Sequence, residues 1–167
     1  MARSPRSKVP FRRRRERKTD YRHRKNLLMS GQPRAVVRCS SRNTVVQFAR
    51  FEAQGDVILA AANTKELTKL GWKRATSNTS AAYLAGYLAG TRAKKSSPKA
   101  VLDIGLRAPT RGSKVFAALK GMLDAGIDIP HDEAILPPED RIKGAHMGED
   151  VPKMFETVLA KIGKEGS

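Results

Sequence analysis

The sequence predicts an α/β protein in which a mixed five-stranded sheet carries helices on its faces, with a basic N-terminal arm and a C-terminal helix. Three observations lead to this prediction. Three β-rich segments joined by tight turns come first, helical segments then alternate with short apolar strands, and twelve Lys and Arg residues crowd into residues 1–25. We therefore expect a basic arm (1–26), a globular α/β domain (27–131), and a C-terminal loop and helix packed on that domain (132–167).

The arm holds 12 Lys and Arg residues against two acids, with little apolar material beside them. Because desolvating an unpaired arginine is costly, such a run either stays in water or meets a polyanion. We expect the arm to be extended or disordered in the free protein. Residues 12–25, which follow a break at Pro10, are rich in helix formers and are expected to become helical against a partner.

The segment after the arm predicts an antiparallel meander. Residues 35–39, 44–51 and 57–61 are rich in the β-branched, aromatic and small apolar residues of strands. Short polar turns at 41–43 and 53–56 separate them. Turns this short can join only antiparallel strands.

Residues 79–90 predict a helix that begins at an N-cap, either Asn78 or Thr79. Small residues recur along it at four-residue intervals, at Ala82, Gly86 and Gly90. We expect this spacing to let the helix lie close on the sheet. A membrane helix is excluded, because Arg92 ends the apolar run far short of a bilayer span.

Two more strands and two more helices complete the predicted domain. Residues 99–106 predict a buried strand, a helix capped by Ser113 follows and stops at Gly126, and residues 127–130 predict a short last strand. A final amphipathic helix begins near Asp150. Strands joined by helical crossovers are parallel neighbours, so this order predicts a ribonuclease-H-like sheet.

Charge and composition limit the function classes. The formal net charge is +17: residues 1–25 carry +10, residues 26–120 carry +12 and residues 121–167 carry −5. A basic front and an acidic rear indicate one polyanionic partner that approaches from one side. The single cysteine, Cys39, excludes a disulfide framework and fits a reducing compartment. We expect a cytoplasmic protein with no signal peptide and no membrane contact.

A ribonuclease-H-like enzyme is the first alternative. Such enzymes hold metal ions with clustered carboxylates, one of them on the first strand, and the expected first strand carries no acid. Asp103 is the lone carboxylate on a strand, and we expect it to accept a hydrogen bond or a salt bridge. The stretch "RGSKV" (111–115) lacks the glycine spacing of a nucleotide loop, although a helix start there can hold an RNA phosphate. We expect no enzymatic activity, no cofactor and no metal.

Other conspicuous side chains have an ordinary structural explanation. His131 and His146 lie near acids, but two loop histidines fifteen residues apart are a weak metal motif. We expect Trp72, the only tryptophan, to pack beneath its loop rather than to stack on a base. The adjacent pair Lys73 and Arg74 is the better nucleic-acid candidate.

Eight stretches together resemble one family. They are "KVPFRRRRERKTDYRHRKNLL" (8–28), "SGQPRAVVR" (30–38), "GDVILAAA" (55–62), "ELTKLGWK" (66–73), "NTSAAYLAGYLAGTRA" (78–93), "VLDIGL" (101–106), "GSKVFAALKGMLDAGIDIPH" (112–131) and "GAHMGED" (144–150). Over nearly its whole length the chain resembles the universal large-subunit ribosomal protein eighteen family, in its archaeal–eukaryotic branch. The resemblance implies a non-catalytic constituent of the large ribosomal subunit. It also implies binding to 5S rRNA, attachment of 5S rRNA to the large-subunit rRNA in the central protuberance, and neighbouring large-subunit proteins as partners.

The resemblance also implies which residues contact RNA. In the arm these are Lys8, Arg12, Arg13, Arg14, Arg15, Arg17, Lys18, Tyr21, Arg22, Arg24 and Lys25. In the body they are Arg34, Arg38, Arg42, Gln47, Asn78, Arg111 and Ser113. The charge of the first residues and of the loop after Trp72 adds Arg3, Arg6, Lys73 and Arg74 to the predicted RNA-binding set.

Two roles are expected within this set, because phosphate contacts alone carry no sequence information. The arm supplies affinity through phosphates, and the folded sheet recognises one RNA shape through Arg38, Arg42 and Gln47. A generic basic chaperone that binds any RNA is the second alternative. The acidic residues 121–167 are expected to face solvent or a basic neighbouring protein.

Overall fold

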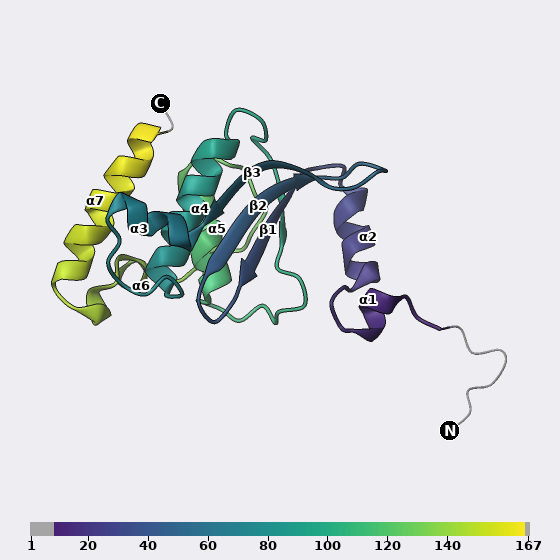
Figure 1. Ribbon diagram of the computed structural model, residues 1–167, viewed down its shortest axis with the longest axis horizontal. Helices are drawn as coiled ribbons and strands as arrows, with labels where there is room; N and C mark the ends of the chain where they lie inside the picture. Colours follow the sequence, from purple (N-terminus) through teal and green to yellow (C-terminus); the bar gives the residue numbers. More distant parts are fainter. Residues whose placement is uncertain (1–8, 166–167) are drawn as a thin grey trace, which may run out of the picture.

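The computed structural model of the chain describes residues 9–165, and a four-stranded mixed sheet lies at its centre (Figure 1). β1 (Arg34–Cys39), β2 (Thr44–Arg50) and β3 (Val57–Asn63) form the expected antiparallel meander. β4 (Val101–Asp103) pairs parallel with β1, which gives the order β3-β2-β1-β4. The predicted mixed α/β sheet is therefore confirmed in type.

The number of strands differs from the prediction: the described chain forms four strands and not five. Residues 127–130 reach the position of a fifth strand, but they form only an isolated parallel bridge between Lys99 and Asp128. Asp128 exchanges two backbone hydrogen bonds with the neighbouring segment, and Pro130, which has no N–H, cannot extend the ladder. The ribonuclease-H-like topology, which includes that fifth strand, is therefore not confirmed.

Two helices cover one face of the sheet. α4 (Thr79–Ala93) packs on β2 and β3, and α5 (Lys114–Asp124) packs on β1. Asn78 caps α4, because its side-chain oxygen accepts a hydrogen bond from the Ala81 N–H at 2.7 Å. Ser113 occupies the N-cap of α5, as expected. The buried side chains between these layers include Val37, Phe48, Leu84, Leu88, Leu119 and Met122.

Glycines let these two helices touch backbone to backbone. A Cβ added at Gly86 would lie 2.1 Å from the carbonyl oxygen of Ala118, and Gly90 lies against Met122. The expectation that these glycines approach the sheet was wrong, since they face α5. Gly86 lies against Ala118 and Gly90 lies against Met122, so later residues of α4 meet later residues of α5. The two helices are therefore parallel, and both begin at the same edge of the sheet.

The remaining elements pack around the start of α4. Between β3 and α4 these are η1 (Thr64–Glu66) and α3 (Leu67–Leu70), and in the C-terminal part they are η2 (Glu133–Ile135), α6 (Glu139–Lys143), η3 (Ala145–Met147) and α7 (Asp150–Glu165). α7 contacts α3 and α4 through the buried side chains of Phe155, Val158 and Ile162. Trp72 is 1% exposed and donates its Nε1–H to the Ala75 carbonyl, which confirms that it packs beneath its loop. None of the described helices is long and apolar enough to cross a bilayer.

The described part of the arm is helical. α1 (Arg12–Arg15) and α2 (Tyr21–Met29) lie at the end of the molecule opposite α7 (Figure 1). The expected extended arm was wrong for these residues, because helix starts and stops encoded within them order the backbone in the chain alone. Arg3, Arg6 and Lys8 lie outside the described residues.

The close contact of α4 and α5 gives a stability prediction. Gly86→Ala should destabilise the protein by about 3 kcal/mol, because its methyl group meets backbone that cannot rotate away. Gly163→Ala is the control, because a Cβ there meets no atom within 4 Å and alanine favours a helix by up to about 1 kcal/mol. Urea unfolding midpoints measure both changes, and equal midpoints would contradict the backbone contact.

Candidate nucleic-acid interface

Four consecutive arginines form α1, and all four side chains are exposed. The helix ends at Arg15, with Glu16 as its C-cap, and the next residue, Arg17, has a left-handed backbone with a φ of 52°. The Lys18 N–H bonds the Arg13 carbonyl and the Arg17 N–H bonds the Arg14 carbonyl, which is the Schellman pattern of a helix end. Glycine is the usual residue at this position. The chain therefore keeps a cation where the backbone alone favours glycine.

Asp20 fixes the start of α2. Its carboxylate accepts hydrogen bonds from the backbone N–H groups of Arg22 and His23 at 2.9 and 3.2 Å. The hydrogen bond from His23 is the largest reason that the pKa of Asp20 is lowered from its ordinary value. The cap therefore stays ionised at neutral pH, and α2 presents Arg22 and Lys25 to solvent.

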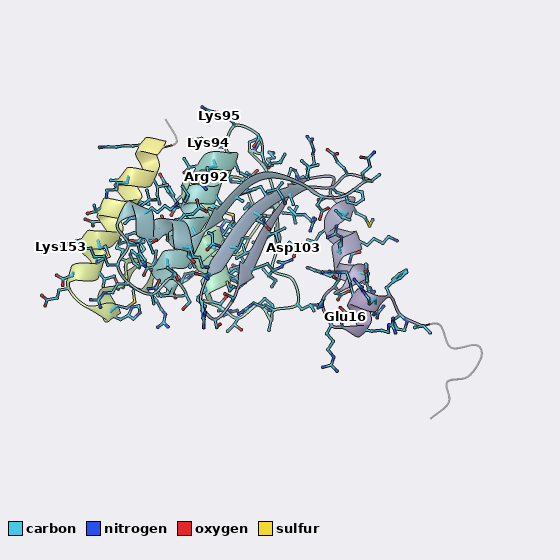
Figure 2. The ribbon with its side chains drawn as sticks, viewed as in Figure 1. Glu16, Arg92, Lys94, Lys95, Asp103 and Lys153 are labelled. Atoms are coloured by element: carbon cyan, nitrogen blue, oxygen red, sulfur yellow. The ribbon has the colours of Figure 1, made fainter. Side chains whose placement is uncertain are left out.

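A chain of ion pairs fastens α2 to the sheet. Arg24 donates two hydrogen bonds to the carboxylate of Asp56, at 2.9 and 3.0 Å. Arg34 donates to the same carboxylate and, at 2.8 Å, to Asp103. Arg38 donates to the second oxygen of Asp103 at 2.8 Å and to the Asp103 backbone carbonyl at 2.7 Å. Figure 2 shows Asp103 where the sheet meets the arm.

Because of these ion pairs, one predicted RNA-binding residue, Arg34, is buried. Arg34 is 2% exposed and lies between two carboxylates, so its side chain is not available to RNA in this structure. Its role is structural. Arg38 keeps 47% of its side chain exposed. Asp103 forms salt bridges with both arginines, which confirms the prediction that it is a paired carboxylate.

The arginines also control the ionisation of both aspartates. Burial by itself raises the pKa of Asp103, but the hydrogen bonds and charges of Arg38 and Arg34 outweigh it and lower the pKa below its ordinary value. The pKa of Asp56 is likewise lowered, because Arg24 and Arg34 outweigh the effect of its burial. Both carboxylates are therefore ionised at neutral pH, and the chain of ion pairs is intact there.

Arm and sheet together enclose a cleft of about 140 Å³. Its lining includes Arg13, Lys18 and Arg24 of the arm and Arg38 of the sheet, beside His23 and the carboxylates of Asp20 and Asp103. Predicted RNA-binding residues that are far apart in the sequence therefore converge here, although Arg24 and Arg38 are also paired with Asp56 and Asp103. The part of the chain that the structure describes has no group of three or more His, Cys, Asp or Glu side chains that could hold a metal ion.

A second group of predicted RNA-binding residues lies at the edge of the sheet formed by the carboxyl ends of β1 and β4, where α4 and α5 begin. The Thr76 hydroxyl donates a hydrogen bond to the Arg42 carbonyl at 2.7 Å, and Arg107 donates to the Cys39 carbonyl. These bonds bring together the loops after β1, before α4 and after β4. Exposed Arg42 and Arg111 lie on these loops, beside the two helix starts. Exposed cations and free helix amides are a suitable surface for phosphates.

Sequence reasoning missed Arg107 at this edge. Arg107 is exposed and follows β4, and the carboxyl ends of parallel strands are the usual place for ligand contacts in α/β sheets. The position of Arg107 after a predicted strand was therefore the feature of the sequence that could have identified it. Ser113 makes no capping hydrogen bond, whereas the side chain of Asn78 is occupied as the cap of α4. The main role of Asn78 in this structure is therefore to position the start of α4.

The remaining candidates lie apart from both groups. Gln47 is half-buried on the sheet face opposite α4 and α5, beside Val36 of the neighbouring strand. Lys73 and Arg74 are exposed near α7, where the Lys73 N–H meets the sulfur of Met154 at 3.3 Å. The structure does not bring this pair together with the arm or with the edge.

Removing the charge of Asp103 tests the ion-pair chain. Asp103→Asn should cost about 3 kcal/mol at pH 7, because it leaves the buried Arg34 with one carboxylate instead of two. The folded pKa of Asp103 lies below the ordinary value of 3.8. Its stabilisation is therefore fully present above the ordinary pKa of 3.8 and is lost as the pH falls below that value through the lower folded pKa.

Denaturant unfolding between pH 7 and pH 3 measures this effect. The difference between Asp103→Asn and the unmodified chain should shrink toward the acid end. Asp128→Asn is the matched control, because its pair with Lys99 is 3.7 Å long and two-thirds exposed, so it should cost less than about 1 kcal/mol. A constant difference across the pH range would contradict the assigned role of Asp103.

Comparisons with known proteins agree with this geometry. A family model described as ribosomal large subunit proteins 60S L5 and 50S L18 matches residues 5–97 and 90–132. The large ribosomal subunit protein uL18 of Korarchaeum cryptofilum is 55% identical over 93% of this chain and 80% of its own length. The uL18 of Methanothermobacter thermautotrophicus is 51% identical over 96% and 84%, and that of Methanococcoides burtonii is 46% identical over both full lengths.

These relatives are components of the ribosome and not enzymes, as the resemblance implied. The predicted cytoplasmic location on the ribosome agrees with them. With a matched region that includes the arm, the sheet and both covering helices, the chain belongs to the uL18 family of large ribosomal subunit proteins.

Proposed function

We propose that the chain binds 5S rRNA and helps to attach it to the large-subunit rRNA in the central protuberance, as a non-catalytic constituent of the subunit. Membership of the uL18 family supports a structural role in the ribosome. The choice of 5S rRNA rests on the family resemblance of the sequence. The physical support is a cationic surface built for a folded polyanion.

The concentration of positive charge at one end of the molecule carries this proposal. The arm helices α1 and α2 lie opposite α7 (Figure 1). The first 25 residues carry +10, whereas α7 balances three acidic residues with three lysines. A polyanion is attracted more strongly to the arm than to α7, so the charges orient the protein as it binds. The acidic segment 121–167 is suited to solvent or to a basic neighbouring protein.

The arm and the body contribute differently to binding. The exposed arginines of α1 are planar, permanently charged donors that fit phosphate oxygens. The cleft and the edge hold Arg38, Arg42 and Arg111 on a rigid scaffold, where fixed spacing can select one RNA shape. Arg34 takes no part in the contact, because it is buried. We keep the other described candidates as RNA contacts in this proposal.

Two competing functions fit the structure less well. A ribonuclease-H-like enzyme needs clustered carboxylates on the sheet, and Asp103 is bound by two arginines instead. A chaperone that binds any RNA needs charge but no fixed arrangement of it. The ion pairs that hold α2 on the sheet give the cations such an arrangement.

Neutralising α1 tests the contribution of the arm. Changing Arg12, Arg13, Arg14 and Arg15 to glutamine should weaken binding to 5S rRNA and lower the salt slope by about 3, because each lost phosphate contact removes about 0.7 to 0.9. The control changes Lys143, Lys153, Lys161 and Lys164 to glutamine, which removes the same charge from α6 and α7 (Lys153 is marked in Figure 2). Titrations at several salt concentrations should show no change in slope for the control. Equal slopes for both variants would contradict an arm contact.

Competition between 5S rRNA and transfer RNA tests the selectivity of the body. The α1 variant should keep the preference of the unmodified chain for 5S rRNA, since the arm supplies affinity. The double variant Arg42→Ala, Arg111→Ala should lose roughly tenfold of that preference, because two charged contacts at the edge are removed. A chain with no preference for 5S rRNA at the outset would sink the proposed function and favour the chaperone.

A further inference from the structure

An aromatic pair stands on the surface of the arm. The ring of Phe11 is 72% exposed, and its centre lies 5.2 Å from that of Tyr21 with an angle of 58° between the planes. Leaving a phenyl ring in water forgoes a burial energy of a few kcal/mol. The two rings contact each other, yet the pair lies outside the hydrophobic core. A ring that is exposed and also held in place has the features of a contact residue.

The backbone holds both rings at ordered positions. Phe11 is the N-cap residue of α1, and its carbonyl accepts hydrogen bonds from the N–H groups of Arg14 and Arg15 at 3.0 and 3.1 Å. Tyr21 is the first residue of α2, directly after the capping residue Asp20. Each ring therefore starts a helix, and little backbone freedom remains to be lost when a ligand binds.

An apolar groove continues from Tyr21 along α2. It has a volume of about 360 Å³ and is lined by Tyr21, Arg24, Lys25, Leu28 and Met29. Met29 is 76% exposed at its far end. Apolar surface that is interleaved with arginine and lysine, and that lies next to the four arginines of α1, suits a ligand with both flat apolar faces and negative charge.

Unpaired RNA bases have this combination, and paired bases do not. In a duplex the base faces are stacked on one another, so a protein ring reaches only phosphates and sugars. In a loop or a bulge the bases are free to stack on aromatic side chains while the phosphates meet cations. A protein partner would match the apolar strip but would have to neutralise the surrounding arginines as well.

We propose that Phe11 and Tyr21 form a stacking site for unpaired RNA bases, so that the arm binds a single-stranded segment in addition to phosphates. This inference rests on the proposed function and deepens it, because it names the kind of RNA segment that the arm binds. It also assigns to Phe11 a role that charge alone does not give.

The test uses the full chain and two probes, a 12-nucleotide oligoadenylate and a blunt-ended, fully paired RNA duplex with the same number of phosphates. Phe11→Ala should weaken binding of the oligoadenylate roughly five- to 150-fold, which is the range for loss of one stacked base. The salt slope should stay unchanged, because no charge is removed, and binding of the duplex should also stay unchanged. Phe11→Tyr should restore binding, since it restores an aromatic face.

Phe51→Ala is the matched control, because Phe51 is an equally large ring that is 53% exposed outside the arm. It should leave both probes unaffected. Circular dichroism of each variant checks that α1 and α2 persist. Equal binding of oligoadenylate by Phe11→Ala and the unmodified chain would overturn the proposal and leave a protein partner as the occupant of the groove. An equal loss for both probes would also overturn it. Failure of the 5S rRNA preference, measured separately, would remove the proposed function without deciding the stacking site.

Discussion

The buried guanidinium of Arg34 is the constraint on which the arrangement of the interface depends. A desolvated arginine is stable only with its charge neutralised by nearby carboxylates. Asp56, from the turn between β2 and β3, and Asp103, from β4, neutralise it and accept hydrogen bonds from Nη2 and Nη1, while the buried Nε has no partner in the described structure. Asp56 also pairs with Arg24 of α2. The ion pairs that neutralise the buried Arg34 therefore fix the sheet register, the turn and the arm relative to one another.

The same ion-pair chain sorts the many cations into two kinds. Arg24, Arg34 and Arg38 each pair with a carboxylate, but only Arg34 among them is buried, and Arg24 and Arg38 keep part of their side chains exposed. In α1, Arg12 forms an ion pair with Glu16, and the side chains of all four arginines are exposed to solvent. A high formal charge therefore overstates the number of contacts available to RNA. The position of each cation matters more than the total.

The sequence contains the local features of this fold but few of its long-range ones. The three strand patterns of the meander, the Asn78 cap and the apolar face of α7 depend on neighbouring residues, and the structure confirms them. The predicted strand at 127–130 does not form, and the one predicted at 99–106 is limited to residues 101–103. The burial of Arg34 depends on aspartates 22 and 69 positions away, which no local pattern reveals. The helical arm had a local signal in Asp20, but its dense positive charge favoured the expectation of an extended chain. Charge composition was the misleading observation there.

An ordered arm changes how affinity arises. A disordered basic tail loses conformational entropy when it binds, and this loss offsets part of every phosphate contact. Here the Asp20 cap, the left-handed turn at Arg17 and the Arg24–Asp56 pair order residues 12–29 before any contact forms. The arginines of α1 and the ring of Phe11 are then presented at fixed positions. Such an arm adds affinity at a smaller entropic cost, because its cations and its ring are already in place when a phosphate or a base arrives.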